Sequence, residues 1–335
     1  MANRVMEVID VFKGKNPGGI MPVAPIYHTA AAGHAGISLK DFANSADKMA
    51  ETAIWSYRNL GLDGVQLTLG VGVEPEALGA KTVQPEKGLP SVTEHLLENL
   101  DNFKKLKAPD PRKDGRMPIF IDAVKKTQDA IGSECCVIAT VRGPFNIASQ
   151  LRGLNNLMLD IYDRPDFVCE LLSFTNHVAY LFAKALVEDA KMPVVAIGEA
   201  LCSSDCISPE YYKKVISPIH KGLVFKLRAA GLQASLLHIC GNIAPLLEAV
   251  KETGVDAVDI DYKSDIGKVL ELGAGLGMRG NLDPAWMLSA KPEEVRKKAR
   301  ELAEKVKGYP WILSSGCDVP YGTPIENIKA LKEAI

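Results

Sequence analysis

Eight short apolar runs recur along the chain, and this recurrence is the feature that most restricts its fold. Each run has the length and the β-branched content of a buried strand, without the strict alternation of a half-exposed strand. Longer amphipathic stretches separate the runs. The eight runs are Met21–Tyr27, Gly64–Leu69, Cys136–Val141, Pro193–Gly198, Ala234–Ile239, Ala257–Ile260, Gly277–Asn281 and Trp311–Gly316.

The stretches between these runs carry the signals of helices. Ser208 is suited to cap a helix, Pro209 to open it, and Gly231 to follow its end. A further helix is expected at Ser91–Leu106, inside a long connection. The other predicted helices are Leu39–Leu60, Asp166–Val187, Pro209–Ala230, Ala244–Thr253, Ile266–Leu272, Pro292–Val306 and Pro324–Ile335.

Strands that alternate with helices predict parallel βα units, and eight such units predict an α/β fold of the (β/α)₈ (TIM) barrel type. The competing architecture is a doubly wound sheet, but no Gly-x-Gly-x-x-Gly motif follows the first run to support it. The connection Pro75–Arg116, between the second and third strands, is too long for a plain loop. We expect it to be an insertion near the barrel mouth, within a single domain spanning residues 1–335.

Charge and cysteine content exclude several classes of protein. The chain has 39 Lys and Arg against 41 Asp and Glu, a net charge of −2, whereas a nucleic-acid-wrapping protein usually has a basic excess. No apolar run approaches a membrane span, and acids interrupt the first ten residues where a signal peptide would be apolar. Seven cysteines do not indicate a disulfide framework. We therefore expect a cytoplasmic protein with reduced thiols that binds neither nucleic acid nor membrane.

Three residues that suit a soft metal lie at the ends of two of the runs. His238 and Cys240 are two residues apart in an extended segment, so both side chains can face the same way. Cys317 follows the eighth run, and the carboxyl ends of all strands meet at one face of a barrel. One imidazole and two thiolates suit catalytic Zn²⁺, with a fourth position left for water or substrate. The alternative is that the three are unrelated buried residues.

Other polar residues at the same face are candidates for the mouth of the site. Asp261, which follows the sixth run, is expected to orient His238 or to act as a labile fourth ligand. Arg142, which follows the third run, is the candidate cation for an anionic substrate, or else a structural ion-pair partner. The remaining candidates for substrate contact are Tyr27, His28, Glu199 and Asn281.

A series of motifs, in order along nearly the whole chain, resembles the uroporphyrinogen decarboxylase superfamily, whose members are (β/α)₈ barrels. The motifs are Gly64-Val-Gln-Leu-Thr, Glu74-Pro-Glu-Ala-Leu-Gly79, Gly143-Pro144, Ile207-Ser-Pro209, His238-Ile-Cys-Gly-Asn242, Gly280-Asn-Leu-Asp-Pro284 and Ser314-Ser-Gly-Cys-Asp-Val-Pro320 with Thr323-Pro-Ile-Glu-Asn327.

Within this superfamily the residues favour methyl transfer over decarboxylation. Decarboxylases carry an Arg-Gln-Ala-Gly-Arg-Tyr segment where this chain has Tyr27-His-Thr-Ala-Ala-Ala-Gly. The decarboxylase aspartate falls on Gly70, its tyrosine on Gln150 and its C-terminal histidine on Cys317. The resemblance implies that His238, Cys240 and Cys317 are the zinc ligands of the methylcobamide:coenzyme M methyltransferase branch.

The resemblance also implies a mechanism and a partner. Zinc would hold a small thiol acceptor, such as coenzyme M, as the reactive thiolate. The methyl group would come from methylcobalamin on a corrinoid-binding protein that docks over the barrel mouth. Two alternatives stay open: a methyltransferase of the O-demethylase type that methylates the corrinoid protein, and a non-catalytic corrinoid- or metal-binding module. The chain also allows a homo-oligomer.

Overall fold

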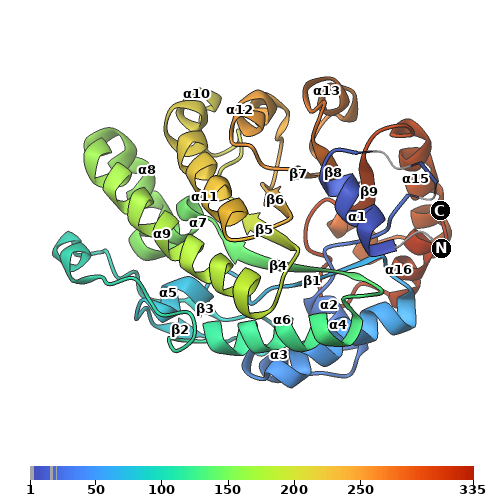
Figure 1. The fold of residues 1–335 in the computed structure, drawn as a ribbon, viewed down its shortest axis with the longest axis horizontal. Coiled ribbons are helices and arrows are strands. Elements are labelled where there is room, and N and C mark those ends of the chain that lie inside the picture. The colour runs from blue at the N-terminus through green and yellow to red at the C-terminus, as the bar shows by residue number, and fades with distance from the viewer. Residues whose placement is uncertain (1–3, 16–17, 20) are drawn as a thin grey trace.

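A curled sheet of parallel strands forms the centre of the molecule, and helices surround it (Figure 1). The computed structural model describes residues 4–15, 18–19 and 21–335, so residues 1–3, 16–17 and 20 of the predicted domain lie outside the described residues. The strand order is β1-β4-β5-β6-β7-β8-β9. The strands are β1 (Gly64–Leu67), β4 (Cys136–Arg142), β5 (Val194–Gly198), β6 (Ala234–His238), β7 (Ala257–Ile260), β8 (Gly277–Leu282) and β9 (Trp311–Ser315).

The first predicted strand, Met21–Tyr27, closes the sheet without forming a regular strand. The Ala24 amide donates to the Leu313 carbonyl of β9 (3.0 Å), and the Val23 carbonyl accepts from the Asp63 amide just before β1 (2.9 Å). The two prolines in this segment have no amide hydrogen, which prevents a full ladder of hydrogen bonds. The predicted (β/α)₈ barrel is confirmed, with this extended segment in the place of the first strand.

The predicted helix Ser91–Leu106 is wrong. The segment begins with β3 (Ser91–Val92), which pairs antiparallel with β2 (Thr82–Val83). It then forms a short 3₁₀ helix, η1 (Leu100–Lys105), none of whose residues is buried. The segment still packs against the core, through the fully buried Leu97 and through Phe103, which contacts Phe167 and Phe174, but it does so in a largely irregular conformation.

Elsewhere the predicted helices form, with two interruptions. Helices α3 (Leu39–Asn44) and α4 (Ala46–Leu60) are separated at Ser45, whose side chain caps α4. The stretch predicted as one helix from Pro209 contains a π-helical turn, because Pro218 has no amide hydrogen for the ladder. The remaining elements are α2 (Thr29–His34), α5 (Val73–Ala77), α6 (Met117–Ile131), α7 (Pro144–Arg152), α8 (Leu154–Asp163), α9 (Pro165–Asp189), α10 (Pro209–Tyr211), η2 (Tyr212–Ile216), α11 (Ser217–Ala229), η3 (Ala244–Leu246), α12 (Leu247–Glu252), α13 (Ile266–Leu272), α14 (Pro284–Ser289), α15 (Pro292–Lys305) and α16 (Ile325–Lys332).

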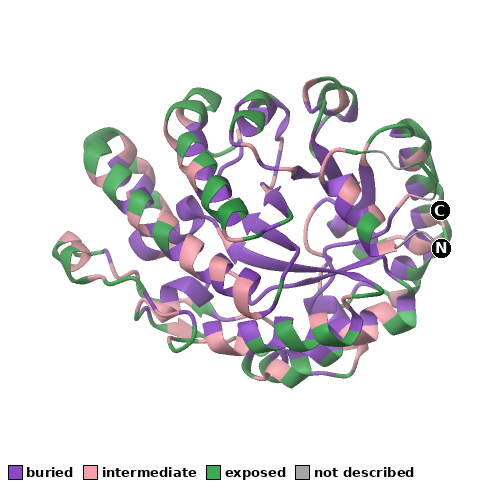
Figure 2. Cartoon of the chain, in the orientation of Figure 1, coloured by how far each residue is buried: buried purple, intermediate pink, exposed green. Residues whose placement is uncertain are grey.

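Helix α1 (Arg4–Phe12) covers the amino-terminal end of the barrel. Its Val8 and Phe12 are buried in one cluster with inward-facing strand residues such as Ile138. The close approach requires Gly277 at the start of β8, where an added Cβ would lie 2.5 Å from the Phe12 carbonyl oxygen. Figure 2 shows the strands buried and the outer faces of the helices exposed. Side chains that bind a ligand from solvent are therefore expected at the opposite end of the barrel, at the carboxyl ends of the strands.

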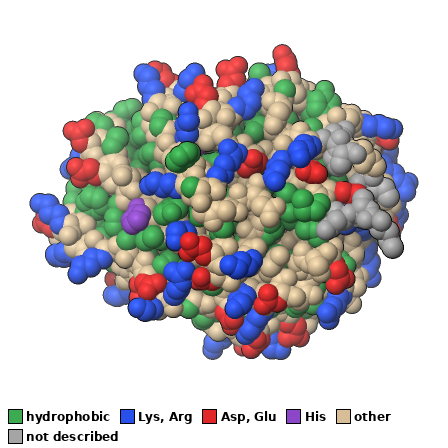
Figure 3. Space-filling model, viewed as in Figure 1, with side chains coloured by type: hydrophobic (Ala, Val, Ile, Leu, Met, Phe, Trp, Pro, Cys, Tyr) green, Lys and Arg blue, Asp and Glu red, His purple; other side chains and the backbone are tan. Residues whose placement is uncertain are grey.

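The surface carries charges of both signs. On the face drawn in Figure 3, Lys and Arg side chains are interspersed with Asp and Glu. Among the described residues, no helix is both long enough and apolar enough to span a membrane.

Candidate metal centre

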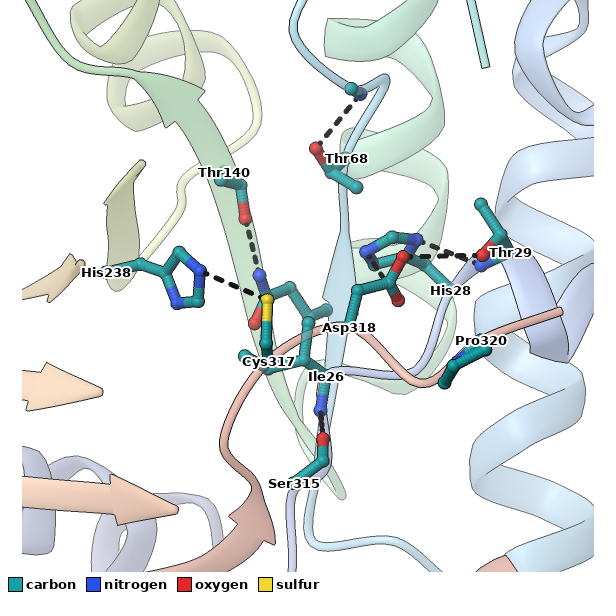
Figure 4. Close-up of polar contacts among 12 residues, drawn as sticks. Ile26, His28, Thr29, Thr68, Thr140, His238, Ser315, Cys317, Asp318 and Pro320 are labelled. Atoms are coloured by element: carbon teal, nitrogen blue, oxygen red, sulfur yellow. Dashed lines mark hydrogen bonds and ion pairs between the residues drawn. The ribbon is translucent and has the colours of Figure 1, made fainter. Parts of the chain in front are cut away.

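Three side chains that can bind a metal converge at the carboxyl end of the barrel. His238 ends β6, Cys240 lies in the loop that follows, and Cys317 follows β9, 77 residues later than Cys240. Cys240 Sγ lies 3.6 Å from Cys317 Sγ, and His238 Nε2 lies 3.4 Å from the first sulfur and 3.8 Å from the second. Figure 4 shows the His238 ring and the Cys317 sulfur pointing toward each other. The structure thus brings together the three residues singled out from the sequence, which we call the metal trio.

The spacing of the metal trio fits a tetrahedral zinc ion. With zinc–sulfur bonds of about 2.3 Å and zinc–nitrogen bonds of about 2.05 Å, the edges of a tetrahedron are about 3.8 Å between sulfurs and about 3.6 Å between sulfur and nitrogen. The observed separations of 3.6, 3.4 and 3.8 Å match these edges to within a few tenths of an ångström. The donor set leaves the fourth corner open, as in a catalytic site.

Asp259 orients the histidine of the metal trio. Its Oδ2 lies 2.7 Å from His238 Nδ1, so the proton on Nδ1 is held there and Nε2 faces the two sulfurs. Burial disfavours the charged imidazole, but Asp259 and Cys317 outweigh burial and raise the pKa of His238 to about 9. The hydrogen bond from Cys240 is the main cause that lowers the pKa of Cys317 to about 4, and the same contact raises the pKa of Cys240. A metal ion that binds here must therefore displace protons.

A fully buried arginine holds Asp259 in place. Arg279 Nε donates to Asp259 Oδ1 (2.7 Å) and Nη2 donates to Oδ2 (2.8 Å). The two residues face each other in register across β7 and β8. Burial raises the pKa of Asp259, but the Arg279 charge and the His238 hydrogen bond outweigh it and lower the pKa. Sequence reasoning missed both residues, although an acid and a base inside two consecutive buried strands were a usable signal.

Asp261 has a different role from the one expected. Its Oδ2 accepts from the Gly241 amide (3.0 Å) and its Oδ1 from the Lys263 amide (3.0 Å), and the side chain is buried. It therefore fixes the loop that carries Cys240. Its carboxylate is not among the described ligand atoms that converge, and the role of orienting His238 belongs to Asp259.

His28 lies beside the metal trio, as expected. Its Nε2 is 3.1 Å from Oδ1 of Asp318, the neighbour of Cys317, and its Nδ1 accepts from the Thr29 amide (2.9 Å; Figure 4). Burial, together with the positive charge of Arg142, lowers the pKa of His28 to about 3. His28 is therefore a neutral imidazole whose proton is on Nε2.

Arg142 is a half-buried guanidinium at the end of β4. Its Nη2 donates to Thr68 Oγ1 (2.6 Å), and within the described part of the chain no carboxylate oxygen lies within 4.0 Å of its side-chain nitrogens. Burial lowers the pKa of Arg142. Nearby negative charges act in the opposite direction, Glu74 most strongly, followed by Cys240, Asp318 and Cys317, so both thiols of the metal trio lie close enough to interact with the guanidinium. Among the described residues, this guanidinium has no direct ion-pair partner, and a guanidinium of this kind beside a metal site is suited to bind an anion.

The other three predicted substrate contacts lie elsewhere. The Tyr27 hydroxyl contacts His34 on α2, and the two rings stack on the outer side of the barrel. Glu199 is fully buried, and its carboxylate is engaged by two amides of α7 and by His220. Asn281 lines a shallow hollow together with side chains of α15. Strand-end position alone did not show which side chains face the barrel centre.

Comparisons with known proteins agree with this architecture. The family model described as uroporphyrinogen decarboxylase (URO-D) matches residues 6–335. The methylcobamide:CoM methyltransferase MtbA of Methanosarcina mazei is 30% identical over 290 residues, which cover 86% of this chain and 84% of the relative. MtbA of Methanosarcina acetivorans is 28% identical over 290 residues, with the same coverage. The solved structure of a methyltransferase from Methanosarcina mazei matches with a TM-score of 0.89 at 24% identity, over 99% of this chain and 98% of that one.

Proposed function

The chain belongs to the uroporphyrinogen decarboxylase family, and we propose that it is a zinc-dependent member that moves a methyl group from a methylated corrinoid protein to a small thiol such as coenzyme M. The observation that carries the proposal is the convergence of His238, Cys240 and Cys317 with tetrahedral spacing. The similarity to methylcobamide:CoM methyltransferases supports the choice of donor and acceptor.

Each residue of the site would have a separate role in such a transfer. His238, Cys240 and Cys317 would hold the zinc. A bound zinc ion lowers the pKa of a thiol, ordinarily near 8.5, and so presents it as a nucleophilic thiolate. Asp259 keeps the Nε2 atom of His238 directed at the site. Arg142 would bind the acid group of the acceptor.

The group transfer itself is a simple displacement. The thiolate sulfur attacks the methyl carbon, a carbon–sulfur bond forms, and the carbon–cobalt bond breaks. Its electron pair stays on cobalt, which passes from Co(III) to Co(I). A corrinoid is too large to enter the barrel, so its carrier protein must dock over the carboxyl end of the strands.

Metal content and turnover test the proposal together. Wild-type protein and Cys317→Ala are purified without added metal and analysed for zinc, with Cys206→Ala as a matched control because Cys206 is exposed and lies outside the metal trio. We expect about one zinc per chain in the wild type and the control, and a sharp loss in Cys317→Ala. A zinc-free wild type is first reloaded, and a chain that still binds no zinc refutes the proposal.

Turnover separates the remaining functions. The zinc-loaded protein is supplied with methylcobalamin and coenzyme M without oxygen, and the methylated thiol is measured by mass spectrometry. Thiol-dependent demethylation of the corrinoid supports the proposal. Methylation of Co(I) corrinoid by a phenyl methyl ether would indicate the O-demethylase type, and a chain that binds corrinoid without turnover would be an accessory module.

A further inference from the structure

Gly198, the last residue of β5, and Glu199, which follows it, lie between Arg142 and the metal trio. In the sheet, Gly198 pairs with Arg142 of β4 on one side and with His238 of β6 on the other. The Gly143 amide donates to the Gly198 carbonyl (2.9 Å), and the Glu199 amide donates to the His238 carbonyl (2.8 Å). These two residues therefore connect the strand that carries the cation with the strand that carries a metal ligand.

Gly198 leaves room for the Arg142 guanidinium. A Cβ atom at position 198 would lie 2.7 Å from Arg142 Nη1 and 3.2 Å from its Cζ. The backbone of Gly198 is outside the left-handed region that favours glycine, so its conformation would accept another residue. The guanidinium therefore lies against Gly198 of β5, in space that a side chain at this position would occupy.

Glu199 fixes the backbone next to Arg142. Its Oε1 accepts from the Phe145 amide (3.0 Å) and its Oε2 from the Asn146 amide (2.8 Å), both in the first turn of α7. A carboxylate is favoured at this end of a helix because it faces the free amides and the positive end of the dipole. A Cβ atom on Gly143 would lie 2.3 Å from Glu199 Cδ, so the carboxylate packs directly under the residue that follows Arg142.

Two more buried side chains, His220 and Tyr212, form a hydrogen-bonded chain that ends on the Glu199 carboxylate. His220 Nε2 lies 2.9 Å from Glu199 Oε1, and the Tyr212 hydroxyl lies 3.1 Å from His220 Nδ1. All three side chains are at most 1% exposed. Tyr212 opens the π-helical turn η2, which brings it and His220 against the end of β5. Both oxygens of the buried Glu199 carboxylate therefore have hydrogen-bond partners in the protein.

We infer that Gly198 is a specificity-determining residue and Glu199 a positioning residue, which together hold the Arg142 guanidinium beside the metal trio and so give the enzyme its preference for thiols that carry an acid group. This inference rests on the proposed function. Glu199 does not touch the thiol and acts through the backbone of Arg142. Gly198 acts through the space that it leaves open.

The test compares two thiols of equal carbon length, coenzyme M, which carries a sulfonate, and neutral 2-mercaptoethanol. Gly198→Ala should lower the ratio of their kcat/KM values by about tenfold or more, the worth of one hydrogen bond to a charged group. Gly222→Ala is the matched control, because Gly222 lies in the middle of α11 and nothing lies within 4 Å of a Cβ at that position. Zinc content is measured in every variant.

A variant of Glu199 and an Arg142→Met background complete the test. Glu199→Gln keeps the size of the side chain and should lower the same ratio, mainly through the KM for coenzyme M. In an Arg142→Met background, Gly198→Ala should leave the ratio unchanged, because the guanidinium it displaces is gone. An unchanged ratio in Gly198→Ala, an equal loss with both thiols, or a wild type without preference overturns this inference. A zinc-loaded wild type that methylates neither thiol overturns the proposed function instead.

Discussion

Asp259→Asn should destabilise the protein and weaken its metal site at the same time. The carboxylate is the ion-pair partner of Arg279, with contacts of 2.7 and 2.8 Å, and both side chains are at most 1% exposed. An amide cannot balance that charge, and a buried charge left without its partner costs about 3–5 kcal/mol. Unfolding of 335 residues carries an entropy of about 0.7 kcal/mol/K. The melting temperature of the metal-free protein should therefore fall by about 4–7 °C.

The loss of metal affinity has a separate cause, and a double variant isolates it. Without the Asp259 carboxylate, His238 loses the contact that orients its ring, which typically weakens metal binding by about 10–100-fold. In Asp259→Leu combined with Arg279→Met, no unpaired charge remains, so most of the stability should return. The zinc affinity should stay low, because His238 Nδ1 still has no acceptor.

Thermal unfolding of the metal-free proteins by circular dichroism and zinc titration against a competing chelator measure the two effects. A single variant with the melting temperature of the wild type would refute the ion-pair argument. A double variant that binds zinc as tightly as the wild type would refute the argument that Asp259 orients the ligand.

Three further predictions follow from other parts of the structure. Tyr27→Phe should lower the free energy of unfolding by about 1 kcal/mol without slowing methyl transfer, because the hydroxyl contacts His34 on the outer side of the barrel; a slower rate would mean that Tyr27 reaches the site. Burial opposes ionisation of Asp63, but hydrogen bonds from Arg4 and Lys332 outweigh it and lower the pKa below 3.8. The stabilisation by ionised Asp63 is complete above the pKa of the unfolded chain and disappears as the pH falls through the lower pKa of the folded protein. Urea unfolding should therefore show Asp63→Asn less stable than the wild type at pH 6 and equal to it in strong acid. A difference in stability that does not depend on pH would contradict this. Without zinc, four thiols should react with dithionitrobenzoate, two exposed and two half-buried, and zinc should leave only the two exposed thiols, Cys169 and Cys206, reactive. Four reactive thiols both with and without zinc would exclude the metal trio as the binding site.

The features of this molecule that can be predicted from its sequence are those that depend on a local pattern of residues. Buried parallel strands are continuous apolar runs, and the spacing of His238 and Cys240 places both on one face of such a strand. The common end of all barrel strands then places Cys317 beside them. The segment 91–106 packs on the core through Leu97 and Phe103 without forming one helix, which a propensity argument cannot detect before the tertiary contacts are known.

The contacts that cross between strands could not be predicted in the same way. Asp259 meets Arg279 because β7 and β8 pair in a particular register, and no local pattern fixes that register. His28 contacts Asp318 beside the site whereas its neighbour Tyr27 contacts His34 of α2, and the sequence did not show which of the two adjacent side chains would face the site. Glu199 was expected at the mouth, but it lies under α7, because the free amides of that helix need an acceptor.

The sealed amino-terminal end of the barrel has a consequence for the order of events during turnover. Since α1 covers that end, the small thiol and the large carrier protein of the proposed reaction would have to use the same entrance. A docked carrier would close the entrance, so the thiol has to arrive first, and the methylated product can leave only after the carrier has departed. Initial-rate kinetics should therefore show an ordered sequential pattern, in which the thiol is the leading substrate and its methylated form the last product released.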